Sequence, residues 1–307
     1  MTGLEEARAL YETYGRPMIH DRFPDYEGRI AVGLAGRGSE CFGYDDALSR
    51  DHDYAPGFCL WLTDEDDIRI GVELARAYRA LPLPGAAERS AMAEDSRGVR
   101  RIGFFYRRYT GSDGAPESLE QWLYLPSSAL AEAVNGQVFR DDLGRFTAIR
   151  NEILHGMPED VRKKKLAARA IEMAQSGQYN YSRCLRHGEE GAAMLAAAEF
   201  VRAACGMIYL LNRRHMPYYK WMLRGLEDLP VLGSMGPALA FLLTGENDRA
   251  GQETKAGVIE DLCAAVAEEL RRQGLSAGDW DYLEPHAFAI QNQIQSPKLR
   301  ALHIMEG

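Results

Sequence analysis

The sequence predicts an α+β protein in which a small mixed sheet with its helices precedes a C-terminal helical bundle. Short apolar, β-branched segments that end at glycines lie in the first part of the chain, as is typical of strands. From residue 118 onward, apolar residues recur mainly at helical spacing. At 307 residues the chain is long enough for two ordinary domains. We therefore expect a first domain over residues 1–140 and a helical domain over residues 141–307.

The first domain is expected to open with a helix. Thr2 and Glu5 have the spacing of a capping box, in which the hydroxyl and the carboxylate each accept a backbone N–H at a helix start. Thr63 precedes three acidic residues and is expected to cap a second helix. We predict helices over residues 2–14 and 63–80. The predicted strands cover residues 29–34, then 51–53 continued by 57–62, and finally 100–106.

Segments with helical spacing predict the bundle. Pro158 lies where one of these helices would begin, since proline is tolerated in the first turn. The basic run 162–165 falls within that helix and is interpreted as a solvated face. The expected helices cover 119–134, 146–154, 158–173, 190–212, 258–270 and 279–293.

Charge and cysteine content limit the classes of partner and compartment. The net charge of −9 argues against a protein that neutralises many phosphates of a polyanion, so nucleic acid is an unlikely partner and a small or cationic acceptor fits better. The five cysteines form no C-x-x-C pair, which indicates neither a disulfide framework nor a zinc site. With no basic leader and no run of eighteen apolar residues, we expect a reduced, cytoplasmic protein without a membrane segment.

Two aspartates supply the strongest chemical signal. In an extended strand, residues two apart project from the same face, so Asp51 and Asp53 place two carboxylates side by side while His52 points away. Like charges this close favour a cation between them, and paired oxygen ligands suit Mg²⁺. Asp51 and Asp53 are therefore the predicted metal ligands and catalytic residues.

A glycine-rich turn precedes these aspartates. Glycines let the backbone approach a triphosphate closely, and the Ser39 hydroxyl with the N–H groups of a following helix start can bind phosphate oxygens. Gly38 and Ser39, with Arg37 in the same turn, are the predicted nucleotide-binding residues. The chemistry that follows is displacement at the α-phosphorus of ATP or another nucleoside triphosphate, with Mg²⁺ at the reacting phosphates.

The order and spacing of these residues resemble the DNA polymerase beta-like nucleotidyltransferase superfamily. Its signature is a hydrophobic residue, Gly-Ser, about a dozen residues and then Asp-x-Asp, which 35–39 and 51–53 match. More narrowly, the motifs G-x-G-S-E, G-x-D-D and S-x-D-H-D resemble those of a bacterial domain-of-unknown-function family. The segments at residues 141–150 and 217–221 resemble the same family. The resemblance implies that residues 1–140 form a nucleotidyltransferase domain.

The resemblance also implies two further site residues. The superfamily pattern includes a third carboxylate on a neighbouring strand, but 102–106 contains no acid. We favour Asp141, with Asp142 and Glu120 as alternatives, although a turn or helix-cap role explains each about as well. In similar antibiotic-modifying enzymes a lysine of the helical domain reaches the triphosphate, and Lys220 is the candidate here.

Three functions remain open from the sequence. The first is transfer of a nucleoside monophosphate to a hydroxyl of a small, antibiotic-like molecule or of a protein. The second is a nucleotide-binding pseudoenzyme or antitoxin-like module. The third is a ribonuclease similar to the HEPN family, because Arg150 and His155 match its R-x4-H pattern. The sequence also leaves open whether the chain forms a homodimer.

Overall fold

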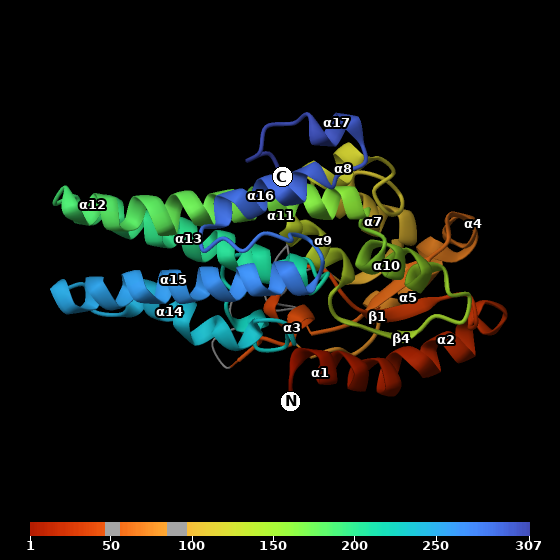
Figure 1. The fold of residues 1–307 in the computed structure, drawn as a ribbon. Coiled ribbons are helices and arrows are strands. Elements are labelled where there is room, and N and C mark those ends of the chain that lie inside the picture. The colour runs from red at the N-terminus through yellow and green to blue at the C-terminus, as the bar shows by residue number, and fades with distance from the viewer. Residues whose placement is uncertain (47–55, 85–96) are drawn as a thin grey trace. The chain divides into compact units, whose positions relative to one another are not determined.

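The computed structural model describes residues 1–46, 56–84 and 97–307 (Figure 1). These residues form an α+β fold, as the sequence predicts, with a small mixed sheet and many helices. The chain divides into two compact units, the first made of residues 1–117 and 128–156, the second of residues 118–127 and 157–307. Each unit has a buried apolar core of its own.

The sheet of the first unit has four strands in the described part of the chain, in the order β3-β2-β1-β4. The central strand β1 runs antiparallel to β2 and β4, while β2 and β3 are parallel. The end of β1 therefore lies beside the starts of its two neighbours. The strands are β1 (Ala31–Leu34), β2 (Cys59–Leu62), β3 (Gly98–Arg101) and β4 (Gln137–Arg140).

Both predicted helix starts in this unit are confirmed. Thr2 and Glu5 form the capping box at α1, and the Thr63 hydroxyl accepts the N–H of Asp66 at α4. Each cap is local in sequence, so its residues identify it without knowledge of the fold. A π-helical turn continues each of these helices into a further α-helix. The first element consists of α1 (Gly3–Leu10), η1 (Tyr11–Gly15) and α2 (Arg16–Arg22). The second consists of α4 (Asp64–Asp66), η3 (Asp67–Gly71) and α5 (Val72–Arg79).

The predicted strand over 100–106 is wrong beyond its first two residues. Strand β3 ends at Arg101, and Ile102 begins helix α7 (Ile102–Thr110). The buried residues of this helix, Ile102, Phe105, Tyr106 and Tyr109, are three and four positions apart, which is the repeat of one helix face. The aromatic content of the segment favoured a strand, but the helical spacing decides its structure.

The predicted helix over 119–134 is interrupted. It consists of α8 (Leu119–Tyr124) and α9 (Ser127–Val134), with Leu125 in an extended conformation between them. Pro126 accounts for the break, because a proline ring disfavours the helical conformation of the preceding residue.

The predicted boundary between residues 140 and 141 would assign helix α10 (Arg145–His155) to the helical domain. In the structure α10 is part of the first unit. Its Phe146 ring stacks on Trp61 of the sheet at 3.9 Å between ring centroids, and the Tyr106 hydroxyl donates to the Phe146 carbonyl. These contacts fix the start of α10 on the sheet.

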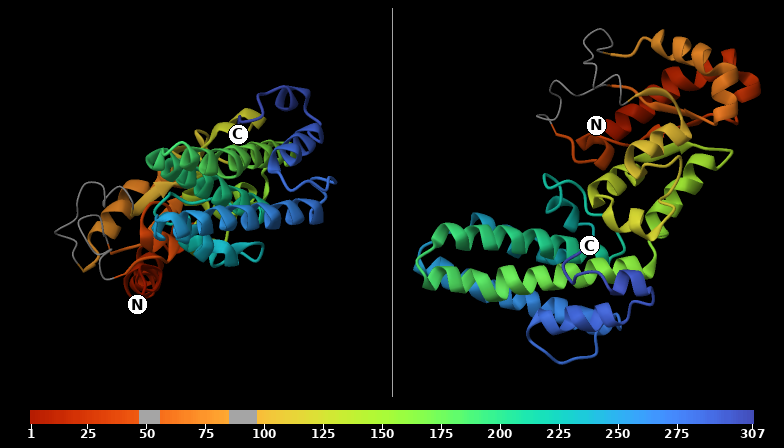
Figure 2. Two further views of the ribbon diagram at one scale, coloured as in Figure 1. Left: turned by 60° about the vertical axis from the view of Figure 1, so that its left-hand side comes forward. Right: turned by 90° about the horizontal axis from the view of Figure 1, so that it is seen from above.

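The second unit is a helical bundle whose long helices lie side by side in both views of Figure 2. Helix α11 packs against α13 and α16. The helices are α11 (Glu159–Met173), η5 (Ala174–Tyr181), α12 (Ser182–Arg186), α13 (Glu190–Leu211), η6 (Arg224–Leu226), η7 (Gly233–Met235), α14 (Gly236–Thr244), α15 (Arg249–Arg272), α16 (Leu283–Asn292) and α17 (Pro297–Arg300).

Helix α13 is the one described helix that is long and apolar enough to cross a membrane by length and composition. In the bundle, 61 % of its most apolar window is buried, and Phe200, Cys205 and Met207 lie in the core. The same properties belong to the core helix of a bundle, so this finding is weak evidence for a membrane span.

The interpretation of the basic run 162–165 as a solvated face is wrong for three of its four residues. Arg162, Lys164 and Lys165 are buried. The Lys164 ammonium donates to the His303 carbonyl at 2.6 Å and to Gln291 at 2.8 Å. The acceptors lie more than a hundred residues away in sequence, so the run alone cannot reveal them.

Lys165 is the least compensated of these cations. Only 9 % of the residue is exposed, and no hydrogen bond or ion pair reaches its ammonium from the part of the chain that the structure describes. Burial, with a smaller contribution from Arg169, lowers the pKa of Lys165 to about 8. Holding the charged form in the folded chain therefore costs free energy at neutral pH.

Replacing Lys165 with methionine is expected to raise the free energy of unfolding by up to about 3 kcal/mol at pH 7. Because the folded pKa is about 8 and the ordinary value is 10.5, the unfolded chain binds more protons between these values. The wild type should therefore gain stability relative to the variant as pH rises from 8 to 10.5. Urea unfolding of both proteins across this range measures the difference, and a difference that stays constant with pH would contradict the assignment.

Candidate functional site

The two predicted metal ligands, Asp51 and Asp53, lie outside the described residues, so the metal site stays a prediction. Among residues 1–46, 56–84 and 97–307, no group of three or more histidine, cysteine, aspartate or glutamate side chains could hold a metal ion. What the structure describes in detail is the predicted nucleotide turn at the end of β1.

This turn has the order strand, glycine turn and helix that the sequence predicts. Gly36 and Gly38 have φ values of 111° and 113°, a region that residues with a Cβ rarely adopt. Ser39 then begins helix α3 (Ser39–Phe42), which is a single turn long and ends at Gly43. The φ of Gly38 favours glycine whatever the space, and an added Cβ would also lie 2.4 Å from a Glu40 carboxylate oxygen, which would have to move.

Asn135 holds the turn from the other side. Its Oδ1 accepts the Gly36 N–H at 2.8 Å, and its Nδ2 donates to the Gly36 carbonyl at 2.7 Å. The next residue, Gly136, packs so closely on β1 that an added Cβ would lie 1.9 Å from the Leu34 carbonyl oxygen. Sequence reasoning did not identify Asn135, although the Asn-Gly pair before a short apolar segment is a turn signal.

A buried ion pair lies behind the turn. Arg97 and Glu40 form a salt bridge in which both side chains are almost completely buried. Removing one partner of such a pair leaves an uncompensated buried charge, which is strongly destabilising. Burial also raises the pKa of the neighbouring Cys41 and Cys59 thiols. Both cysteines are therefore neutral hydrophobic side chains.

The predicted phosphate-binding side chains, Ser39 and Arg37, differ in their exposure and in their contacts with other residues. Ser39 is half-buried, and no hydrogen bond to its hydroxyl is made by the described residues. The Arg37 side chain is 69 % exposed, with Glu132 at 3.9 Å. Burial raises the pKa of this glutamate. Glu132 is a second residue that sequence reasoning missed, since it lies on α9, far along the chain from the turn.

The structure does not bring Asp141 to this turn. Asp141 follows β4, whose Arg140 pairs with Val32 near the start of β1, whereas Ser39 follows the end of β1. The Asp141 carboxylate instead accepts the Thr147 N–H at 2.7 Å, in the first turn of α10. Asp141 thus caps a helix, which is the alternative role that its sequence position allowed.

The other two carboxylates considered for this role are also engaged. Asp142 forms an ion pair with Arg140 at 2.7 Å, and Glu120 forms one with Lys298. The ammonium of Lys298 lowers the pKa of Glu120, as expected for a paired carboxylate. Asp142 lies beside Asp141 in the first unit, and Glu120 belongs to the second unit.

Lys220 belongs to the second unit, in the segment between α13 and η6. It is exposed and follows Tyr218 and Tyr219, whose ring centroids are 4.4 Å apart. Its predicted contact with a triphosphate stays a prediction.

The two residues of the R-x4-H pattern lie on α10. Arg150 donates to the Gly136 carbonyl at 3.4 Å, beneath the glycine turn, and His155 is the exposed last residue of the helix. The contact to Gly136 gives Arg150 a place in the packing of the first unit. His155 ends the helix directly before Gly156, which is a structural role that needs no ribonuclease activity.

Part of the chain matches a protein-family model. Residues 122–222, about a third of the chain, match the model described as Domain of unknown function (DUF4037). The matched segment includes Asn135, Gly136 and Lys220, but neither the Gly36–Ser39 turn nor the two aspartates. Comparison with curated proteins finds no match. The chain is thus similar, over these residues, to a family whose function is not defined.

Proposed function

We propose that the chain is a Mg²⁺-dependent nucleotidyltransferase, which transfers a nucleoside monophosphate from ATP or another nucleoside triphosphate to a hydroxyl group. The observation that carries the proposal is the rigid glycine turn between β1 and Ser39. Two glycines with positive φ open the backbone there, and Asn135 fixes the first of them through two hydrogen bonds. A backbone without side chains in this position suits a polyphosphate.

The turn offers unsatisfied polar groups to a ligand. The Ser39 hydroxyl has no hydrogen-bond partner among the described residues, and the Arg37 guanidinium is largely exposed. A hydroxyl can donate to a phosphate oxygen, and an arginine adds a charge-assisted contact. Helix α3 is too short for a large dipole contribution, so we assign phosphate binding to these side chains and to the open backbone.

The position of β2 supports a role for the two aspartates at the same place. Cys59 of β2 pairs with Gly33 of β1, and the two strands are antiparallel. The chain therefore enters β2 from the end of the sheet at which β1 turns into Ser39. Asp51 and Asp53 precede this entry by eight and six residues.

Carboxylate oxygens are the ligands that Mg²⁺ prefers, and Asp51 and Asp53 would hold it together with phosphate oxygens. The ion would neutralise charge on the phosphates as the acceptor oxygen bonds to the α-phosphorus and pyrophosphate leaves. The acceptor hydroxyl must also lose a proton. Glu132, half-buried beside Arg37 and with a raised pKa, is our candidate to accept it.

The acceptor that best fits the net charge of −9 is a small cationic molecule with hydroxyl groups, such as an aminoglycoside-like or lincosamide-like compound. Protein hydroxyls are the second class of acceptor.

Label transfer tests the proposal. The purified chain is incubated with Mg²⁺, each α-labelled nucleoside triphosphate, and either an aminoglycoside, a lincosamide or a protein acceptor. We expect label on one acceptor class and release of pyrophosphate. Saturable binding of a triphosphate without transfer to any acceptor would favour the pseudoenzyme. Cleavage of an added RNA that is lost in His155→Ala would favour the ribonuclease.

A further inference from the structure

The first unit has a cavity at the end of the sheet opposite the glycine turn. Its volume is about 520 Å³, within the range of small-molecule sites. It forms where β2, β3 and β4 end and where β1 begins, so it is separate from the proposed nucleotide site. The lining residues are Arg29, Thr63, Asp64, Glu65, Ile102, Gly103, Asp113, Leu143, Arg145, Ala148 and Ile149.

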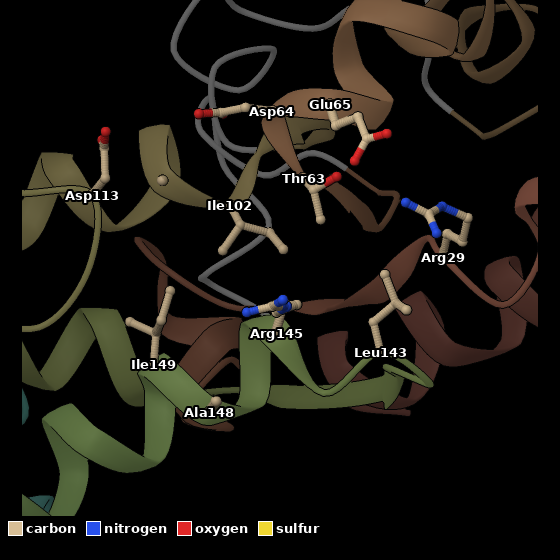
Figure 3. A pocket seen from close by; sticks show the side chains of 11 residues that line it. Arg29, Thr63, Asp64, Glu65, Ile102, Asp113, Leu143, Arg145, Ala148 and Ile149 are labelled. Atoms are coloured by element: carbon tan, nitrogen blue, oxygen red, sulfur yellow. The ribbon is translucent and has the colours of Figure 1, made fainter.

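Two arginines in this cavity have unused donors. Figure 3 shows the guanidinium groups of Arg29 and Arg145 facing the space that Ile102 and Leu143 border. Arg29 binds both oxygens of Asp66 through Nε, at 2.9 and 3.1 Å, and no described residue accepts from its terminal nitrogens. Arg145 is exposed, and within the described ranges its side chain makes no hydrogen bond or ion pair.

The acidic residues of the lining do not use these donors. Each has an arginine partner that is not part of the lining, so its charge is balanced from outside the cavity. The pairs are Asp64 with Arg101 at 3.6 Å, Glu65 with Arg69 at 2.7 Å, and Asp113 with Arg107. The cavity therefore retains the terminal nitrogens of Arg29, whose charge Asp66 balances, and the guanidinium of Arg145, which has no ion-pair partner among the described residues.

Apolar side chains form the remaining wall. Ile102 and Ile149 come from helices α7 and α10, and Leu143, which is 41 % exposed, comes from the loop before α10. Ile102 is almost completely buried, so a ligand in the cavity removes apolar surface from water mainly at Leu143 and Ile149. Arginine forks bind carboxylate and phosphate groups with two parallel hydrogen bonds. The lining thus combines recognition of an anionic group with an apolar surface next to it.

We propose that this cavity binds a small organic anion, in which one carboxylate or phosphate group contacts Arg145 and Arg29 while an apolar part covers Ile102, Leu143 and Ile149. Arg145 is the main determinant, because its guanidinium is the one that no protein group engages within the described part of the chain. The site is independent of the proposed transfer reaction, since it lies at the opposite end of the strands.

Calorimetric titration of the full chain with phenyl phosphate and with benzoate tests the proposal and separates the two anionic groups. Inorganic phosphate lacks the apolar part, and benzyl alcohol lacks the charge. We expect at least one of the two organic anions to bind with one-to-one stoichiometry, more tightly than either control compound. Arg145→Gln should weaken this binding by about tenfold or more, the typical effect of losing a charge-assisted hydrogen bond.

The matched control is Arg79→Gln, which removes an exposed arginine of α5 that does not line the cavity. It should leave the affinity unchanged, and both variants should unfold at the wild-type temperature, because neither arginine side chain makes a hydrogen bond or ion pair with the residues that the structure describes. The proposal is overturned if neither organic anion binds saturably at millimolar concentration, or if binding is the same in Arg145→Gln. A triphosphate bound at the glycine turn would not be affected by either variant.

Discussion

Asp51→Asn and Asp53→Asn are each expected to lower the rate of nucleotidyl transfer by about a thousandfold or more, an effect at least as large as removal of a single transition-state hydrogen bond. Asparagine keeps the size of the side chain but not the negative charge that binds Mg²⁺. Initial rates with saturating triphosphate and the acceptor found by label transfer measure the loss. The unfolding midpoint should stay near that of the wild type, because a metal site of like charges does not stabilise the metal-free fold.

Asp21→Asn is the control for charge removal. Asp21 is exposed on α2, and its replacement should leave the transfer rate and its dependence on Mg²⁺ unchanged. Transfer at the wild-type rate by either Asp51→Asn or Asp53→Asn would remove the metal assignment. Equal losses in all three variants would indicate an effect of net charge and not of metal ligation.

Gly136→Ala is expected to lower the free energy of unfolding by about 3 kcal/mol or more, through overpacking and backbone strain together. The residue has a φ of 70°, and the new Cβ would lie 1.9 Å from the Leu34 carbonyl oxygen on the central strand. The backbone fixes the position of the Cβ, and its neighbour is a backbone oxygen, so no side-chain rotation relieves the contact. Chemical denaturation followed by circular dichroism measures the change.

Gly144→Ala separates the effect of backbone strain from the effect of overpacking. Gly144 has nearly the same φ, 67°, but an added Cβ would meet nothing within 4 Å. It should therefore cost only about 1 kcal/mol, the strain of the left-handed conformation. Equal destabilisation by the two variants would show that the close approach of Gly136 to β1 is not a major constraint.

Local signals in the sequence predicted a large part of the fold. The caps at Thr2 and Thr63 depend on residues within one helical turn, and both helices begin there. The strand that ends in Gly36 and Gly38 was predicted from β-branched residues followed by glycines, and the structure has β1 and then α3 at this place. Such signals need no knowledge of tertiary contacts.

The elements that sequence reasoning missed depend on distant residues. Lys164 can be buried because carbonyls near the C-terminal end of the chain accept hydrogen bonds from its ammonium, and the sequence of α11 by itself resembles a solvated face. The first part of helix α7 was assigned to a strand because its aromatic residues favour that structure, whereas its buried face packs against Phe146 and Trp61 at helical spacing. In both cases tertiary contacts override the local preference.

In the candidate site, too, the residues of a local motif were predicted from the sequence, and the residues that contact them from distant segments were not. Ser39 and the glycines were identified from the motif, and the structure places them in a tight, supported turn. Asn135 and Glu132, which support or flank that turn, come from segments about a hundred residues away and carry no signal in the motif. Asp141 was chosen because it follows a short apolar strand, but the antiparallel direction of β4 places it at the other end of β1.

The most direct test of the account is a crystal structure of the chain with Mg²⁺ and a non-hydrolysable nucleoside triphosphate. We predict that the phosphates lie against Gly38 and the Ser39 hydroxyl, and that Asp51 and Asp53 share a Mg²⁺ ion with phosphate oxygens. A triphosphate bound elsewhere, for example between Arg29 and Arg145, with both aspartates free of metal, would contradict the proposed function.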